Sequence, residues 1–155
     1  MDKTREIVLE EFEKSEEDVK DGMDISICAL NMQTRQLLWA GANNPLWIIR
    51  AGSAEVEEVK ANKQPIGKHT DHADFTTHAI QLNKGDSVYV FTDGFQDQFG
   101  GEKGKKYKAG KIKEMLLTLQ QRNMEEQRTA LEKEFVSWQG KHEQVDDVTF
   151  IGIRV

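Results

Sequence analysis

The chain has 155 residues, of which 37% are hydrophobic and 31% charged, a balance typical of one folded domain rather than of a disordered chain. Its formal net charge of −6 disfavours nucleic-acid binding through a basic face. No apolar run approaches the ~20 residues that cross a bilayer, and the first residues do not form a signal peptide. With Cys28 as its one cysteine, the chain is expected to be cytoplasmic.

The first predicted element is a helix over Thr4–Val19, in which apolar residues recur on one face between charged residues. Gly22 then breaks the helix, and a β-rich block follows. The first strand of this block is apolar on both faces and is expected to be buried, whereas the stretch 61–74 reads as a polar surface loop. The predicted strands are Ile25–Leu30, Arg35–Ala40, Leu46–Arg50, Glu55–Lys60, Phe75–Leu82 and a central strand, Ser87–Thr92.

Helical periodicity returns in the last third of the chain. Apolar residues recur at i, i+3, i+4 and i+7 from Ile112 to Leu119, and a similar spacing runs from Met124 to Trp138. Gly140 ends the second helix, and Val148–Val155 is a final strand. A helix, several antiparallel strands, two helices and a strand predict an α+β fold with helices packed on a sheet.

Two acidic clusters lie at the ends of predicted strands. Asp93-Gly94 directly follows the central strand, and Asp146-Asp147 precedes the last one. If these strands are neighbours, the carboxylates converge at one sheet edge, and oxygen ligands of this kind suit Mg²⁺ or Mn²⁺. Taken singly, such aspartates are more often turn or solvated residues, and the same holds for Asp21 and Asp24.

Five short motifs follow one another along the chain. They are Asp21-Gly22-Met23-Asp24-Ile25-Ser26, Gly41-Ala42-Asn43-Asn44-Pro45-Leu46, Pro65-Ile66-Gly67, Phe91-Thr92-Asp93-Gly94-Phe95-Gln96-Asp97-Gln98-Phe99-Gly100-Gly101 and Asp146-Asp147-Val148-Thr149. Together they resemble the SpoIIE-type branch of the protein phosphatase 2C-like, metal-dependent serine/threonine phosphatases, from about residue 5 to Val155. The resemblance implies an antiparallel β-sandwich flanked by helices, with a two-metal Mn²⁺ or Mg²⁺ centre between the sheets.

The resemblance also assigns roles to residues. Asp93 and Asp146 match the family's catalytic metal ligands, and Asp147 is the weaker candidate of its pair. Gly94 would allow a tight turn beside the metal. Asp21 and Asp24 match a motif whose acidic residues lie near an additional, weaker metal site.

The sequence departs from the family at one place. No Gly-Asp-x-x-Gly-His-Gly segment, whose aspartate bridges both metals in the family, occurs in the chain. We therefore expect residues 1–155 to be one partial phosphatase domain, incomplete at its N-terminus, with weakened metal binding and a misplaced nucleophile. Exposed sheet edges are then expected to cause self-association.

The leading functional hypothesis is hydrolysis of phosphoserine or phosphothreonine by metal-activated water in bacterial signalling. The resemblance implies a phosphorylated regulatory protein as substrate, such as an anti-sigma-factor antagonist, and a sensory domain upstream. The alternatives are a non-catalytic regulatory or binding module with this fold, and a hydrolase of small phosphoesters. A lysine run between Lys103 and Lys113 is more often a solvated face, although its place after the metal motif could attract a phosphorylated partner.

Overall fold

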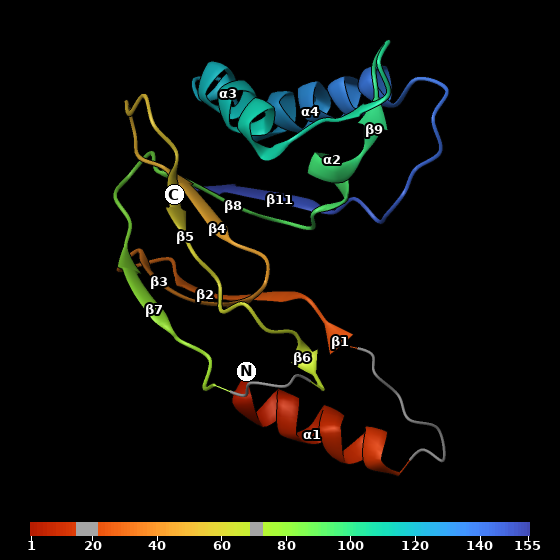
Figure 1. The fold of residues 1–155 in the computed structure, drawn as a ribbon. Helices are drawn as coiled ribbons and strands as arrows, with labels where there is room; N and C mark the ends of the chain where they lie inside the picture. The colour runs from red at the N-terminus through yellow and green to blue at the C-terminus, as the bar shows by residue number, and fades with distance from the viewer. Residues whose placement is uncertain (15–21, 69–72) are drawn as a thin grey trace. The chain divides into compact units, whose positions relative to one another are not determined.

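The computed structural model of the chain describes residues 1–14, 22–68 and 73–155 (Figure 1). They divide into two units, one holding Met1–Leu46 and Glu58–Leu82, the other Trp47–Glu57 and Asn83–Val155. Among the helices of the described residues, none has the length and apolar character needed to cross a bilayer.

The first unit is built on α1 (Asp2–Glu13), which lies against β6 (Ile66–Gly67) (Figure 1). The helix starts two residues earlier than predicted, and the predicted end at Val19 lies outside the described residues. β6 pairs antiparallel with β1 (Gly22–Met23), and Ile66 is fully buried in a small core with Ala42 and Phe75. The prediction of a polar surface loop over 61–74 is therefore wrong at Ile66, whose apolar side chain anchors the segment.

The first unit also holds a three-stranded antiparallel sheet in the order β2-β3-β7. The strands are β2 (Ile25–Asn31), β3 (Gln36–Ala42) and β7 (His78–Gln81). A hairpin turn joins β2 to β3, in which the Asn31 side chain accepts from the backbone N–H groups of Gln33 and Thr34. β2 is an edge strand and its Ile27 is 41% exposed, so the expectation that this strand is buried on both faces is wrong.

The second unit contains most of a four-stranded sheet in the order β11-β8-β4-β5. The strands are β4 (Leu46–Ile49), β5 (Glu57–Val59), β8 (Ser87–Phe91) and β11 (Phe150–Arg154). β8 lies inside the sheet, as predicted for the central strand. Two helices, α3 (Ala109–Leu119) and α4 (Met124–Gln139), lie on the same side of the β8–β11 pair (Figure 1).

Aromatic and aliphatic side chains join these helices to the sheet. Phe91 of β8 packs against Trp47 and Phe150, with ring centroids 4.2 and 5.2 Å apart. The buried Gln127 of α4 accepts from the Tyr89 hydroxyl at 2.8 Å, and its amide donates to the carbonyl of Leu119. The same helix–sheet layer therefore contains an apolar core and one satisfied polar contact.

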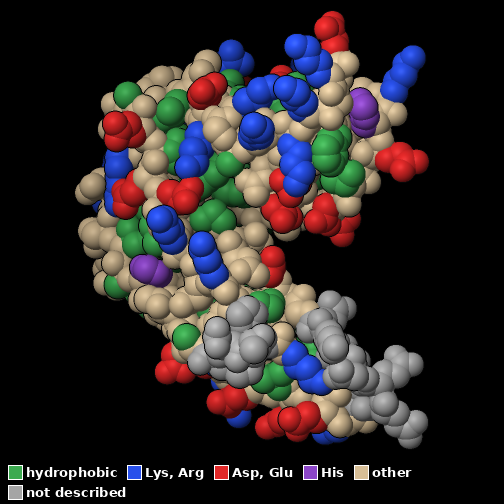
Figure 2. All heavy atoms as spheres, viewed as in Figure 1, with side chains coloured by type: hydrophobic (Ala, Val, Ile, Leu, Met, Phe, Trp, Pro, Cys, Tyr) green, Lys and Arg blue, Asp and Glu red, His purple; other side chains and the backbone are tan. Residues whose placement is uncertain are grey.

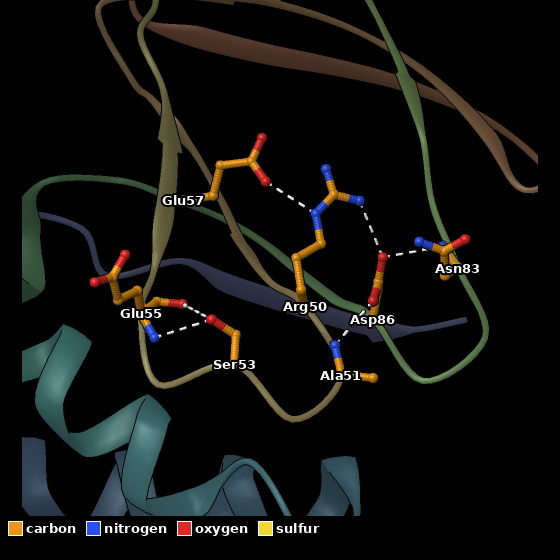
Figure 3. A network of polar contacts seen from close by, with 7 residues as sticks. All are labelled: Arg50, Ala51, Ser53, Glu55, Glu57, Asn83 and Asp86. Atoms are coloured by element: carbon orange, nitrogen blue, oxygen red, sulfur yellow. Dashed lines mark hydrogen bonds and ion pairs between the residues drawn. The ribbon is translucent and has the colours of Figure 1, made fainter.

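A polar network joins the β4–β5 turn to the turn before β8 (Figure 3). The Asp86 carboxylate, 2% exposed, accepts from the backbone N–H groups of Ala51 and Asn83 and from the Arg50 guanidinium at 3.0 Å. Arg50 also donates to Glu57 at 2.9 Å. Burial alone raises the pKa of Asp86, but the three donors outweigh it and the pKa is lowered.

Three short elements connect β8 to α3 and were not predicted. They are α2 (Gly94–Asp97), β9 (Phe99–Gly100) and β10 (Lys105–Lys106). The predicted α+β fold itself is confirmed, because the strands pair antiparallel and helices pack on the sheets.

Candidate functional site

The two acidic clusters meet at the end of the β8–β11 pair. The antiparallel register runs from Ser87↔Arg154 to Phe91↔Phe150, and the contact continues beyond the strands. The Thr92 N–H donates to the carbonyl of Thr149 at 3.0 Å, while the Thr92 hydroxyl accepts from the Thr149 N–H at 2.9 Å. The same hydroxyl donates to the carbonyl of Asp147 at 2.8 Å. Thr92 therefore fixes the segment before β11 against the segment after β8.

Gly94 is required by the close approach of these two segments. A Cβ atom at this position would lie 2.5 Å from the Asp147 carbonyl oxygen and 3.2 Å from that of Asp146. The first contact is shorter than a carbon and an oxygen tolerate and the second is tight, so a side chain would force the segments apart. The half-buried Asp93 precedes Gly94 and caps α2, and its carbonyl accepts from the Asp97 N–H at 3.0 Å.

The Asp146–Asp147 segment is exposed but locally ordered. The Asp146 carboxylate accepts from the Asp147 N–H at 2.7 Å, and the Asp146 carbonyl accepts from the Gln144 side-chain amide at 2.8 Å. Neither carboxylate forms an ion pair with a cationic side chain of the described residues. Their negative charge is therefore available to an external cation.

These groups are oxygen donors gathered at one junction. Carboxylate and carbonyl oxygens at one junction are the ligands that Mg²⁺ and Mn²⁺ prefer. However, within residues 1–14, 22–68 and 73–155 no group of three or more His, Cys, Asp or Glu side chains gathers closely enough to hold a metal ion. Within those residues, the carboxylates of Asp93 and Asp146 therefore do not form a complete metal site by themselves.

The remaining predicted residues are Asp24 and Asp21. Asp24 belongs to the first unit, where its carboxylate accepts from the Asn43 side-chain amide at 2.7 Å. Asn43 has a positive φ of 59°, a conformation that asparagine tolerates better than most residues. Asp21 lies outside the described residues. Of the six predicted residues, the structure therefore brings together Asp93, Gly94, Asp146 and Asp147.

Comparison with known proteins identifies the family. The SpoIIE family, stage II sporulation protein E, matches residues 2–155. The chain belongs to the SpoIIE family. No curated protein matches the chain in sequence.

Three solved structures show how the SpoIIE-family chain compares with its relatives. The SiaA-PP2C domain of Pseudomonas aeruginosa is 31% identical with a TM-score of 0.79, over 88% of this chain and 53% of that one. The Mn-presoaked phosphatase domain of the cell fate determinant SpoIIE from Bacillus subtilis is 18% identical with a TM-score of 0.62, over 85% and 56% of the two chains. RsbX in complex with magnesium is 20% identical with a TM-score of 0.59, over 84% and 55%. The chain thus spans about half the length of these relatives.

Sequence reasoning missed two residues that support the junction in this SpoIIE-family chain. The buried Gln98 follows α2, and its carbonyl accepts from the Trp138 indole N–H and the Tyr107 N–H, both at 3.0 Å. Its side-chain amide donates to the carbonyl of Glu143 at 2.8 Å. The second missed residue is Thr92. In the sequence, it looks like any other threonine at the end of a strand. The signal for both was their position inside motifs that contain the aspartates.

A cavity of about 690 Å³ lies between α4 and β11, within the second unit. Its walls are mainly apolar and include Tyr89, Leu131, Phe135 and Phe150, while Glu125 and Arg128 lie among its polar lining residues. The cavity is also bordered by Ile151 and Gly152 of β11. It is therefore a mainly apolar space between the last strand and its covering helix.

Proposed function

We propose that the chain is the metal-binding C-terminal part of a phosphoserine/phosphothreonine protein phosphatase that acts in bacterial signalling. The main support is the junction at Thr92, because it holds Asp93 and Asp146 at the same end of two paired strands. Membership of the SpoIIE family and the phosphatase domains among its structural relatives also support this proposal.

Different residues of the chain would bind the metal ion and fix the backbone around it at such a site. A bound Mn²⁺ or Mg²⁺ would supply an activated water and offset negative charge on the phosphoryl oxygens. The carboxylates of Asp93 and Asp146 would hold the cation, with Asp147 as a lesser ligand. Gly94 keeps the backbone compact, and Thr92 fixes the spacing between the two acidic segments. The Mn-presoaked SpoIIE domain and the magnesium complex of RsbX support this choice of metals.

The whole protein is proposed to act on a phosphorylated regulatory protein, such as an anti-sigma-factor antagonist, in the cytoplasm. A sensory domain upstream of the phosphatase domain would control it. Because this chain spans about half of its structural relatives, these properties are proposed for the longer protein.

A second candidate is a non-catalytic regulatory module that retains the phosphatase fold. It is supported by the junction, where no third His, Cys, Asp or Glu side chain of the described residues joins the acidic pair to hold a metal ion. A module of this kind would bind a partner protein without turnover.

The test is Mn²⁺-dependent hydrolysis of p-nitrophenyl phosphate, with Mn²⁺ binding measured in parallel by calorimetry. The chain is assayed alone and in a version preceded by a family Gly-Asp-x-x-Gly-His-Gly segment. Asp93→Asn and Asp146→Asn are expected to lower both turnover and Mn²⁺ affinity, by tenfold or more, because each removes a charged ligand. Asp97→Asn is the matched control, since Asp97 lies on α2 but pairs with Lys106 at 2.9 Å.

The outcomes separate the two candidates. Turnover in the extended version that is lost in both aspartate variants, but not in Asp97→Asn, would establish the phosphatase. If Mn²⁺ affinity is unchanged in Asp93→Asn and Asp146→Asn, and neither the chain nor its extended version shows turnover, the phosphatase is refuted and the regulatory module is favoured.

A further inference from the structure

Six lysines lie within eleven residues of the second unit, although the whole chain has a net charge of −6. Figure 2 shows Lys and Arg side chains gathered over the part of the molecule that holds α3 and the β9–β10 hairpin. We call these residues the lysine surface: Lys103, Lys105, Lys106, Lys108, Lys111 and Lys113.

Backbone pairing fixes the lysine surface to the residues that follow Asp93. β10 pairs antiparallel with β9, with Lys105 opposite Gly100 and Lys106 opposite Phe99. The Lys108 N–H donates to the carbonyl of Gln96 at 2.8 Å, and the Tyr107 N–H donates to that of Gln98. Backbone hydrogen bonds therefore join the segment of Lys105, Lys106 and Lys108 to the residues directly after α2, which Asp93 precedes.

Side-chain contacts then divide the lysines into three groups. Lys106 forms an ion pair with Asp97 at 2.9 Å. The Lys111 ammonium lies 3.9 Å from the Trp138 ring centroid, and that of Lys113 lies 4.9 Å from the Trp47 ring. The contact with Trp138 holds the Lys111 ammonium in place without neutralising its charge. By contrast, Lys103, Lys105 and Lys108 are exposed and have no acidic partner in the described part of the chain.

We propose that the lysine surface docks an acidic protein segment that carries phosphoserine or phosphothreonine and presents it to the neighbouring Asp93 junction. This proposal rests on the proposed phosphatase function. Local positive charge on a negatively charged protein concentrates acidic ligands at that place and raises their association rate. A nucleic acid fits less well, because the lysines themselves cover the Trp47 and Trp138 rings on which bases would stack.

The experiment measures fluorescence anisotropy of a fluorescein-labelled dodecapeptide in which phosphoserine is flanked by Asp and Glu, in low salt and without metal. Lys103→Glu/Lys105→Glu is compared with Lys84→Glu/Lys133→Glu, two exposed lysines of the same unit outside the lysine surface. Both double variants change the net charge equally, so only the place of the change differs. The first is expected to weaken binding about tenfold, and the second less than about threefold.

This design distinguishes a failure of the docking proposal from a failure of the proposed phosphatase function. Binding that depends on the lysine surface and persists in Asp93→Asn supports docking, whatever the turnover of the chain. Equal losses in the two double variants, or equal affinity for the peptide with unmodified serine, would overturn the proposal. Tighter, lysine-dependent binding of a labelled single-stranded DNA dodecamer would also overturn it, in favour of a nucleic-acid site.

Discussion

Gly94 is the residue on which the geometry of the acidic junction depends most directly. Gly94→Ala is expected to lower the free energy of unfolding by about 1–3 kcal/mol, because the added Cβ would meet the Asp147 carbonyl at 2.5 Å. Mn²⁺ affinity should fall with it. Gly110→Ala in α3 is the control: its Cβ meets no atom within 4 Å, and alanine favours a helix by up to about 1 kcal/mol. Urea unfolding and calorimetry measure both effects, and equal behaviour of the two variants would contradict the prediction.

Asp86 gives the second unit a pH-dependent contribution to stability. Because the pKa of Asp86 is lowered in the folded protein, its ionised form stabilises the fold above 3.8, the usual value for aspartate, and this stabilisation is lost as the pH falls through the lower folded value. Asp86→Asn should therefore cost about 2 kcal/mol at neutral pH and progressively less in acid.

The control for Asp86 is a second carboxylate on the same arginine. Glu57 also pairs with Arg50 but is 47% exposed, so Glu57→Gln should cost less than about 1 kcal/mol. Urea unfolding across pH 3 to 7 compares the two, and a larger loss in the Glu57 variant would contradict the assignment.

At the scale of elements, α4 has a complete N-terminal cap. The Asn123 side chain accepts from the Glu126 N–H at 2.9 Å, and the Glu126 carboxylate accepts from the Asn123 N–H at 3.1 Å. Asn123→Ala should lower the free energy of unfolding by about 1 kcal/mol and speed amide exchange in the first turn of α4. Gln121→Ala, two residues earlier and outside the cap, should change neither, and protection that is unaffected by Asn123→Ala would refute the role of the cap.

The elements also show where sequence reasoning succeeds. Long periodic segments such as α3 and α4, and the apolar strand β8, were predicted because their patterns report burial directly. The pairing of β8 with β11 places Asp93 near Asp146, but the Thr92 bridge depends on two residues 57 positions apart in the chain. The exposure of β2 and the burial of Ile66 were missed because they depend on which strands become neighbours, and local sequence does not encode this.

At the scale of the whole molecule, β11 is an exposed apolar edge. It pairs with β8 alone in the described sheet, and its Ile151 and Ile153 are 51% and 43% exposed. Antiparallel pairing of two copies about Gly152 would place each Ile151 opposite the Ile153 of the other copy. Edges of this kind are prone to pair with another chain, so self-association is expected.

Sedimentation velocity at tens of micromolar protein tests this prediction. The wild-type chain should sediment as a dimer or larger species, and Ile151→Lys/Ile153→Lys should shift it to the monomer. Met32→Lys, at a 68% exposed position in the β2–β3 turn, should leave the distribution unchanged. A wild-type monomer at these concentrations would rule the prediction out.

The contact between Trp138 and the segment after Asp93 has an optical consequence. The indole N–H of Trp138 donates to the Gln98 carbonyl, and the Trp138 carbonyl accepts from the Gly101 N–H. The Lys111 ammonium lies over the Trp138 ring. The emission of an indole responds to hydrogen bonding and to nearby charge, so the chain carries a label-free reporter beside its candidate site. Trp39, 1% exposed and in the first unit, supplies a background shielded from solvent, whereas Trp47 lies beneath Lys113 of the lysine surface. Cations at the junction and anions at the lysine surface can therefore be followed in the unlabelled protein by the colour and intensity of its own fluorescence.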